Sequence, residues 1–156
     1  MVADIDALHK YLKARIKIYI MKDHREPTLE SLAQLLSNTL YSRRFMPYYT
    51  FNLLCGMTVE GEGMVYGYDA IGSYDKLTYG VQGSGTQLGA PILDNQFFGH
   101  NFLVKKYPTN LEDTLNTQKD ILHGIAERDI YTGDNIEFTV ITNEGIRVTR
   151  EPLRRD

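Results

Sequence analysis

The chain has few of the residues that support disulfide, zinc or membrane chemistry. It contains one cysteine, Cys55, in 156 residues, which excludes an internal disulfide and a cysteine-rich zinc site. No apolar run approaches the roughly 18 residues that a membrane-spanning helix needs. Asp4 and Asp6 stand where a secretory signal would carry basic residues. The sequence therefore predicts no signal peptide and an intracellular, soluble protein.

An excess of charge of one sign is also lacking. Lys and Arg number 17 against 20 Asp and Glu, for a net charge of −3, which excludes a domain-wide polyanion-binding field but leaves a local basic patch open. A hydrophobic content of 42% with 24% charged residues argues against disorder. The length predicts a single domain spanning residues 1–156.

Hydrophobic periodicity predicts a mixed architecture. Apolar residues at three- and four-residue steps predict helices over residues 5–20, 29–40 and 110–128, with Thr28 as an N-cap and a short helix through Leu88 to Leu93. Alternating apolar residues predict strands, and residues 97–107 are expected to form a loop. The predicted strands cover residues 49–57, 64–68, 76–81, 136–140 and 146–150. Helices grouped between hairpins favour an α+β fold with antiparallel sheets.

The turn Gly83-Ser84-Gly85 joins a predicted strand to a predicted helix, where backbone N–H groups can bind an anion. The spacing lacks the third glycine of a dinucleotide-binding loop, and no Lys-Ser/Thr pair follows to form a phosphate loop. Gln82 breaks the Gly-x-Ser-x-Gly pattern of hydrolases. We therefore interpret these glycines as residues that supply the φ angles of a tight turn.

Histidine and cysteine also favour structural roles. Cys55 could act as a nucleophile with a histidine beside it, but its place among the apolar residues of a strand predicts a small buried side chain. No histidine has metal-ligand spacing, so a metal site is not expected and all four are predicted to lie at the surface. These are His9, His24, His100 and His123.

The first predicted helix carries a row of basic residues on one flank. A solvated helix face is the commoner meaning of such a row, and an RNA or an acidic partner is the alternative. The row consists of Lys10, Lys13 and Lys17, followed by Lys22 and Arg25.

A series of short motifs occurs in order along nearly the whole chain. Single tripeptides are weak evidence, but the ordered series resembles the beta subunits of the eukaryotic 20S proteasome, nearest to their non-catalytic beta type-1 branch at the sixth beta position. The motifs are Leu35-Leu36-Ser37, Tyr41-Ser42-Arg43-Arg44-Phe45, Pro47-Tyr48-Tyr49-Thr50-Phe51-Asn52, Tyr68-Asp69-Ala70-Ile71-Gly72-Ser73-Tyr74, Gly83-Ser84-Gly85, Leu93-Asp94-Asn95-Gln96, Glu127-Arg128-Asp129-Ile130-Tyr131-Thr132-Gly133-Asp134, Gly145-Ile146 and Leu153-Arg154-Arg155-Asp156.

The resemblance implies a fold and a cellular role. The fold is the four-layer αββα sandwich of N-terminal-nucleophile hydrolases, with helices outside two antiparallel sheets. The role is that of a non-catalytic structural subunit of the 20S core, which acts in ATP- and ubiquitin-dependent protein degradation in the cytoplasm and nucleus. Neighbouring alpha and beta subunits are the implied partners, without cofactor, metal, nucleic acid or membrane.

The resemblance also implies which residues lie near the family's active site. Catalytic members use an N-terminal threonine whose amine helps to activate its hydroxyl, supported by a serine in the Gly-Ser-Gly turn and an Asp/Ser pair in a second turn. Here these positions match Ser84, Asp129 and, with Thr in place of Ser, Thr132. We expect them to form hydrogen bonds that hold two turns beside a vestigial site.

The family's first strands, which carry the nucleophilic threonine, have no counterpart before Asp4. We therefore expect no catalysis by this chain alone. Two alternatives stay open at this point. One is a catalytic threonine-protease subunit whose nucleophile-bearing half lies outside the sequence. The other is a small module that binds RNA or protein through its basic first helix.

Overall fold

The computed structural model describes residues 1–98, 108 and 110–153. They fall into two units, Met1–Thr78 and Tyr79–Asp156, and each unit is described by itself. No helix within the described ranges is long and apolar enough to span a bilayer.

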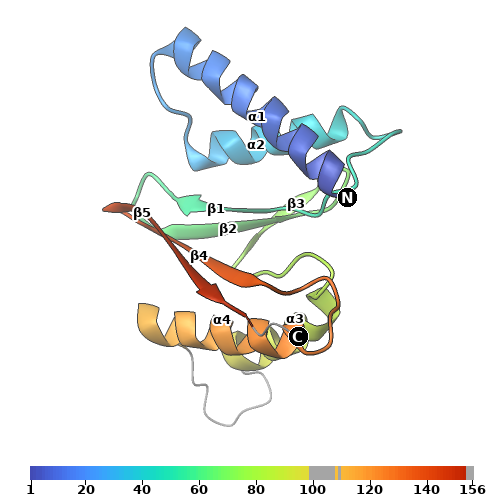
Figure 1. Ribbon diagram of the computed structural model, residues 1–156. Helices are drawn as coiled ribbons and strands as arrows, with labels where there is room; N and C mark the ends of the chain where they lie inside the picture. Colours follow the sequence, from blue (N-terminus) through green and yellow to red (C-terminus); the bar gives the residue numbers. More distant parts are fainter. Residues whose placement is uncertain (99–107, 109, 154–156) are drawn as a thin grey trace. The chain divides into compact units, whose positions relative to one another are not determined.

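Unit 1 consists of two helices and a three-stranded sheet. The helices are α1 (Val2–Asp23) and α2 (Leu29–Tyr41), and the strands are β1 (Leu53–Met57), β2 (Gly63–Tyr68) and β3 (Tyr74–Leu77). The strands pair antiparallel in the order β1-β2-β3. Both helices lie on the same side of this sheet (Figure 1). The two helices and the antiparallel pairing that the sequence predicts are therefore confirmed.

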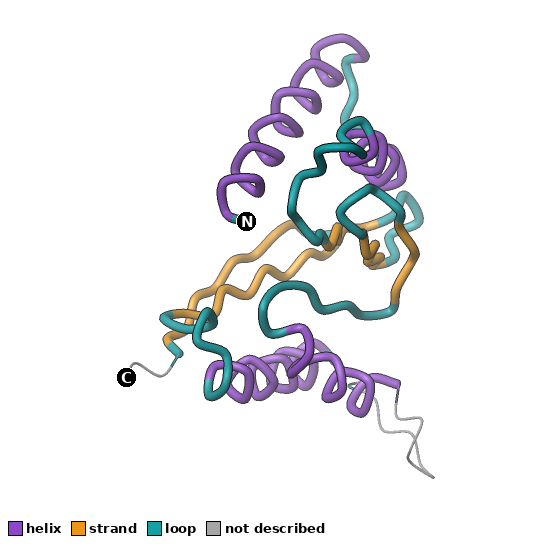
Figure 2. Tube along the Cα trace, turned by 90° about the vertical axis from the view of Figure 1, so that its right-hand side faces the viewer, coloured by secondary structure: helices purple, strands orange, loops and turns teal. Residues whose placement is uncertain are grey.

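Local signals define the connection between α1 and α2. Helix α1 ends at His24, which adopts the left-handed conformation with φ of 51°. Thr28 caps α2, because its hydroxyl accepts a hydrogen bond from the Ser31 backbone at 3.2 Å. From this connection the two helix axes run in different directions in both views (Figures 1 and 2). The space between them is a groove of about 710 Å³ lined by both helices.

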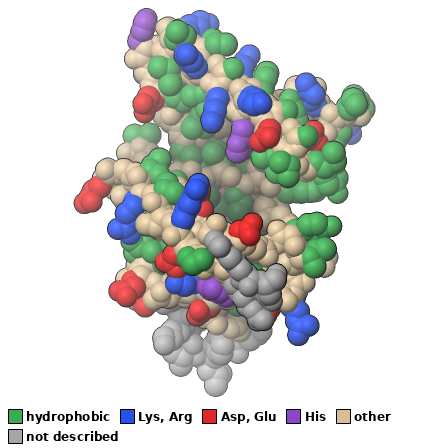
Figure 3. All heavy atoms as spheres, viewed as in Figure 1, with side chains coloured by type: hydrophobic (Ala, Val, Ile, Leu, Met, Phe, Trp, Pro, Cys, Tyr) green, Lys and Arg blue, Asp and Glu red, His purple; other side chains and the backbone are tan. Residues whose placement is uncertain are grey.

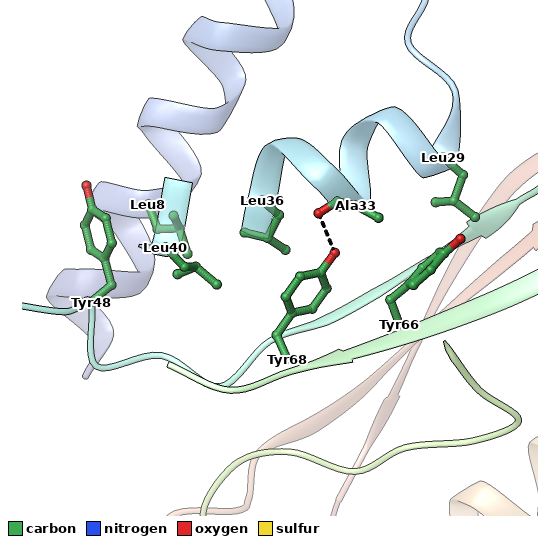
Figure 4. Packing of buried hydrophobic residues seen from close by; sticks show 8 residues of the cluster. All are labelled: Leu8, Leu29, Ala33, Leu36, Leu40, Tyr48, Tyr66 and Tyr68. Carbon is green, nitrogen blue, oxygen red and sulfur yellow. Dashed lines mark hydrogen bonds between the residues drawn. The ribbon is translucent and has the colours of Figure 1, made fainter. Parts of the chain in front are cut away.

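The core of unit 1 lies between α2 and the sheet. Tyr66 and Tyr68 rise from β2 toward α2, and the Tyr68 hydroxyl donates a 2.8 Å hydrogen bond to the Ala33 carbonyl (Figure 4). Helix α1 contributes Leu8, which is only 1% exposed. The buried cluster comprises Leu8, Leu29, Ala33, Leu36, Leu40, Tyr48, Tyr66 and Tyr68.

The prediction that Cys55 is a buried side chain is wrong, because Cys55 is exposed. The helices cover the other face of β1: Leu54 packs into the helix-covered core, and a Cβ on Gly56 would meet Leu29 at 2.7 Å. The apolar residues that alternate with these lie on the opposite face, where Leu53 is 36% exposed. Period two thus identified the strand correctly, but the face that the helices cover carries Leu54 and Gly56, not Cys55.

The third strand also differs from its predicted position. It covers Tyr74–Leu77, not residues 76–81. The Asp69 carboxylate accepts hydrogen bonds from the backbone of Ile71 at 3.0 Å and of Ser73 at 2.8 Å, and Gly72 takes a φ of 93°. This turn closes the hairpin early, so pairing begins with Tyr74 opposite Tyr68. The first strand likewise begins at Leu53 instead of residue 49.

The described residues of unit 2 form three helical segments and a hairpin. They are α3 (Thr86–Leu93), the π-helical η1 (Asp94–Phe98), α4 (Leu111–Ala126), β4 (Asn135–Thr142) and β5 (Gly145–Pro152). Strands β4 and β5 pair antiparallel. The predicted helices and hairpin are confirmed. Of the loop predicted over residues 97–107, Phe97 and Phe98 belong to η1, and the remainder lies outside the described residues.

Helix α4 forms two buried clusters in unit 2. One joins α4 to α3 through Leu93, Ile121 and Ile125. The other joins α4 to the hairpin through Ile136 and Phe138, together with Leu153. These β4 residues define the helix-covered face of the hairpin. On the opposite face, Ile146 is 70% and Val148 is 53% exposed.

Candidate functional site

The structure brings together the three residues that the sequence singled out, Ser84, Asp129 and Thr132. The Ser84 hydroxyl donates to Asp129 Oδ2 at 2.6 Å, and the Thr132 hydroxyl donates to the same oxygen at 2.7 Å. The Tyr131 backbone N–H donates to Oδ1 at 3.1 Å. One carboxylate therefore joins the turn before α3 to the turn after α4.

Close packing of two helices sets this geometry. A Cβ on Gly85 would lie 2.5 Å from Ile125 Cγ2, and one on Gly89 would lie 3.0 Å from Ile125 Cδ1. The absence of side chains at both glycines lets α3 approach α4 closely. Gly83, with φ of 114°, turns the chain so that Ser84 faces the end of α4.

The second turn is held by its own backbone. The Thr132 N–H donates to the Asp129 carbonyl at 3.2 Å, and the Leu153 N–H donates to the Asp134 carbonyl at 2.9 Å. Asp134 adopts a left-handed φ of 62°, which Asp tolerates better than most residues. The turn is thus attached to α4 at one end and to the chain following β5 at the other.

These hydrogen bonds also set the electrostatics of the site. The Ser84 hydroxyl, the Thr132 hydroxyl and the Tyr131 N–H all stabilise the charged carboxylate, so the pKa of Asp129 lies below its ordinary value. A carboxylate with a lowered pKa is a weak general base at neutral pH. Each hydroxyl donates its proton to this carboxylate, so neither proton is passed to an imidazole or amine. Chemically, the arrangement suits a clamp between turns better than an activated nucleophile.

The remaining candidate residues do not join this cluster. Cys55 belongs to unit 1, and partial desolvation raises the pKa of its thiol, which disfavours the nucleophilic thiolate at neutral pH. His9 and His24 are exposed as predicted, His123 is partly buried, and His100 lies outside the described residues. Within the described ranges, no group of three or more His, Cys, Asp or Glu side chains could hold a metal ion.

The basic row of α1 is exposed at each of its positions, as a solvated helix face requires. These positions are Lys10, Lys13, Lys17, Lys22 and Arg25. The two ion pairs found among described residues lie in unit 2 and involve Lys119 with Glu151 and Arg150 with Glu137. The first helix therefore presents solvated cations, with no ligand geometry specific to a nucleic acid.

Sequence reasoning missed the residues that position the clamp. Gly85 and Gly89 are four residues apart, and that spacing on a helix is a signal of close helix packing that was available in the sequence. Their partner Ile125 lies on the buried face of α4, within the helix predicted over residues 110–128. A second contact in unit 2, between the Tyr79 hydroxyl and the Asp94 carboxylate, has no sequence signal because the two residues are 15 positions apart.

Comparison with known proteins identifies the family. The model of the family described as "Proteasome subunit" matches residues 1–141, and the chain belongs to this family. Together with the antiparallel sheets and their helical cover, this membership implies a fold of the N-terminal-nucleophile hydrolase class.

The curated relatives narrow the assignment to beta subunits. "Proteasome subunit beta type-1" of Arabidopsis thaliana is 42% identical over 159 residues, covering 99% of this chain and 71% of the relative. The protein of the same name from Oryza sativa subsp. japonica is 44% identical over 158 residues, covering 98% of this chain and 72% of the relative. "Probable proteasome subunit beta type-6" of Schizosaccharomyces pombe is 32% identical over 163 residues, covering 99% and 72%. The chain is a homologue of beta type-1 subunits of the 20S proteasome.

Proposed function

We propose that the protein is a non-catalytic, structural member of the beta ring of the 20S proteasome core. Its partners are neighbouring alpha and beta subunits, and it contributes to particle assembly and to ATP- and ubiquitin-dependent protein degradation in the cytoplasm and nucleus. Membership of the proteasome family and similarity to beta type-1 subunits across 99% of the chain support the assignment.

The non-catalytic part of the proposal rests on the similarity to beta type-1 subunits, and the hydrogen bonds of Asp129 agree with a structural role for the residues around it. Ser84 and Thr132 both donate to a carboxylate oxygen, at 2.6 and 2.7 Å, and that carboxylate has a lowered pKa. This arrangement does not place either hydroxyl as a nucleophile, because a carboxylate with a lowered pKa is a weak base. We assign the three residues to a vestigial site in which they hold two turns in place.

We further propose that units 1 and 2 belong to one domain, a four-layer αββα sandwich. Each sheet has one face covered by helices and one face with exposed apolar side chains. On β1 the open face includes Leu53 and Cys55, and on β5 it includes Ile146 and Val148. Stacking the two open faces removes this apolar surface from water, as in other sheet-on-sheet packings.

Reconstitution with a covalent probe tests the function. The full chain is mixed with the other core subunits, and assembled particles are treated with an electrophile that labels nucleophilic hydroxyls. We expect the chain to copurify with the particles and to remain unlabelled while catalytic subunits react. Labelling of the chain would instead support the alternative, a catalytic threonine protease. Absence of the chain from complete particles would contradict membership of the ring.

A further inference from the structure

The segment that follows α2 exposes two large apolar side chains at the tip of a turn. Phe45 is 93% exposed and Met46 is 83% exposed. We define residues 43–47 as the Phe45 loop. It protrudes beyond the end of α2 in Figure 1, and Figure 3 shows hydrophobic side chains beside cationic ones at that place. Neither side chain belongs to the buried cluster of unit 1.

The Phe45 loop is constrained by backbone hydrogen bonds and by buried residues on both sides of it. The Arg44 N–H donates to the Tyr41 carbonyl and the Met46 N–H to the Arg43 carbonyl, both at 3.0 Å. The chain is buried on both sides of the loop, at Leu40 with 0% and Tyr48 with 7% exposure. Because the backbone is already ordered, docking of the tip loses less conformational entropy than docking of a flexible segment.

The charge of the loop is entirely positive. Arg43 and Arg44 are the only ionisable side chains that carry charge at neutral pH in residues 41–51. The Arg43 guanidinium lies 4.7 Å from the centre of the Tyr48 ring, and that of Arg44 lies 5.1 Å from the centre of the Phe45 ring. Neither Arg43 nor Arg44 takes part in the ion pairs found among the described residues. The tip thus presents an aromatic and a thioether side chain next to fixed cations.

We propose that the Phe45 loop is the anchor by which this subunit docks on a neighbouring subunit, in an apolar pocket flanked by carboxylates. Because the tip is convex, its partner surface must be concave. Phe45 and Met46 require apolar residues at the bottom of that pocket, and Arg43 and Arg44 require carboxylates at its edge. Buried aromatic anchors with adjacent arginines dominate the energetics of protein interfaces. The inference rests on the proposed function, because it takes the neighbour from the same proteasome particle.

A membrane surface is the competing partner for a cationic, apolar loop. Electrostatic attachment to anionic lipid depends on a cluster of several basic residues, and the loop offers only two arginines beside two apolar side chains. Unit 1 also adds Asp4 close to this region, where its carboxylate accepts the Tyr49 N–H at 3.0 Å. A narrow tip with so few basic residues favours a protein pocket over a lipid surface.

Two measurements in reconstituted particles test the anchor. First, the double variant Phe45→Ala/Met46→Ala is compared with wild type in a competition for incorporation. We expect its apparent association constant to fall by about tenfold or more, as for a hot spot. The matched control is Val59→Ala, because Val59 is 77% exposed in the turn after β1 of the same unit, and it should incorporate like wild type.

Second, Phe45 is replaced by a benzophenone amino acid, and the cross-linked peptide is identified after assembly and irradiation. We expect a peptide of another core subunit that contains apolar residues and at least one Asp or Glu. Normal incorporation of the double variant, or cross-links confined to the chain itself, would overturn the anchor while leaving the proposed function intact. Failure of the wild-type chain to enter particles would overturn both. Binding to vesicles of three parts phosphatidylcholine and one part phosphatidylserine that is lost in the double variant would assign the loop to a membrane and also overturn the anchor.

Discussion

The Tyr68 hydroxyl donates a 2.8 Å hydrogen bond to the backbone carbonyl of Ala33, linking the middle of α2 to β2. Both residues are almost completely buried, with exposures of 2% and 1%. Burial is the main reason that the pKa of the Tyr68 phenol is raised far above its ordinary value. The phenol therefore remains a hydrogen-bond donor across the whole physiological pH range.

Removal of this donor should weaken unit 1 without changing its shape. We expect Tyr68→Phe to lower the free energy of unfolding by about 1 kcal/mol, the usual net contribution of a protein hydrogen bond. Tyr74→Phe is the matched control, since the Tyr74 hydroxyl lies 3.4 Å from its acceptor on Gln34 in an exposed position. Urea denaturation of the full chain gives both values. Equal losses for the two variants would contradict the importance assigned to the buried bond.

The titration of Asp129 tests the clamp. The folded pKa is lowered, so the interaction contributes stability above the unfolded value of about 3.9 and loses it as the pH falls through the folded value. We expect the Asp129 carboxyl carbon, followed by NMR, to titrate below about pH 3.9 in the wild-type chain. Ser84→Ala should move its midpoint upward, because Ser84 is the first contributor to the shift.

Thr86→Ala is the control for that titration. Thr86 belongs to the same turn, but its hydroxyl donates to the Gly83 carbonyl at 2.7 Å and not to Asp129. This variant should leave the Asp129 midpoint unchanged. If Ser84→Ala also left the midpoint unchanged, the hydroxyl would not stabilise the carboxylate as described.

A methyl group at Gly85 should separate α3 from α4. Its Cβ would lie 2.5 Å from Ile125 Cγ2, and such overpacking typically costs about 1–3 kcal/mol. Gly124→Ala is the control, because a Cβ at Gly124 meets nothing within 4 Å and a helical Gly→Ala change is neutral or stabilising. Thermal denaturation should show a lower Tm for Gly85→Ala but not for Gly124→Ala. In an Ile125→Ala background, which lacks the clashing Cγ2 methyl, Gly85→Ala should lower the Tm by less than it does in the wild-type chain. An unchanged Tm would contradict the close approach.

The proposed stacking of the two sheets predicts that damage to one open face is felt by the other. Leu53→Asp places a charge on the open face of β1, where burial against a second sheet would be costly. We expect faster amide exchange in β4 and β5 as well as in unit 1, whereas Val59→Asp, at an exposed turn, should change neither. If amide exchange rose only within unit 1, the proposed stacking of the two sheets would be contradicted.

The sequence predicts the helices of this fold well because their signals are local. Thr28 caps α2 through its side-chain oxygen as predicted. Asn110, predicted as the first residue of a helix, is the N-cap of α4. The buried side chains of the strands are harder to predict from the sequence, since their burial depends on which face of the sheet the helices cover. Cys55 and Leu53 look like core residues along the strand, but Leu54 and Gly56 are the residues that face the helices.

The candidate site likewise has a part that the sequence predicts and a part that depends on tertiary packing. The turn residues Ser84, Asp129 and Thr132 follow from the family resemblance, because their motifs are continuous in sequence. The close approach that joins them does not, since it depends on the fit of Gly85 and Gly89 against Ile125 across 36 to 40 positions of sequence. The exposure of Phe45 could not be predicted from the sequence pattern either, because an apolar residue in a turn can point to solvent or pack inward.

The most direct test of the central claim is single-particle imaging of core particles reconstituted with the full chain. The account predicts density for the chain at a beta-ring position, with β1–β3 and β4–β5 as two stacked sheets and helices on both outer faces. Complete rings in which every beta position is filled by other subunits, with this chain left in the unassembled fraction, would contradict it.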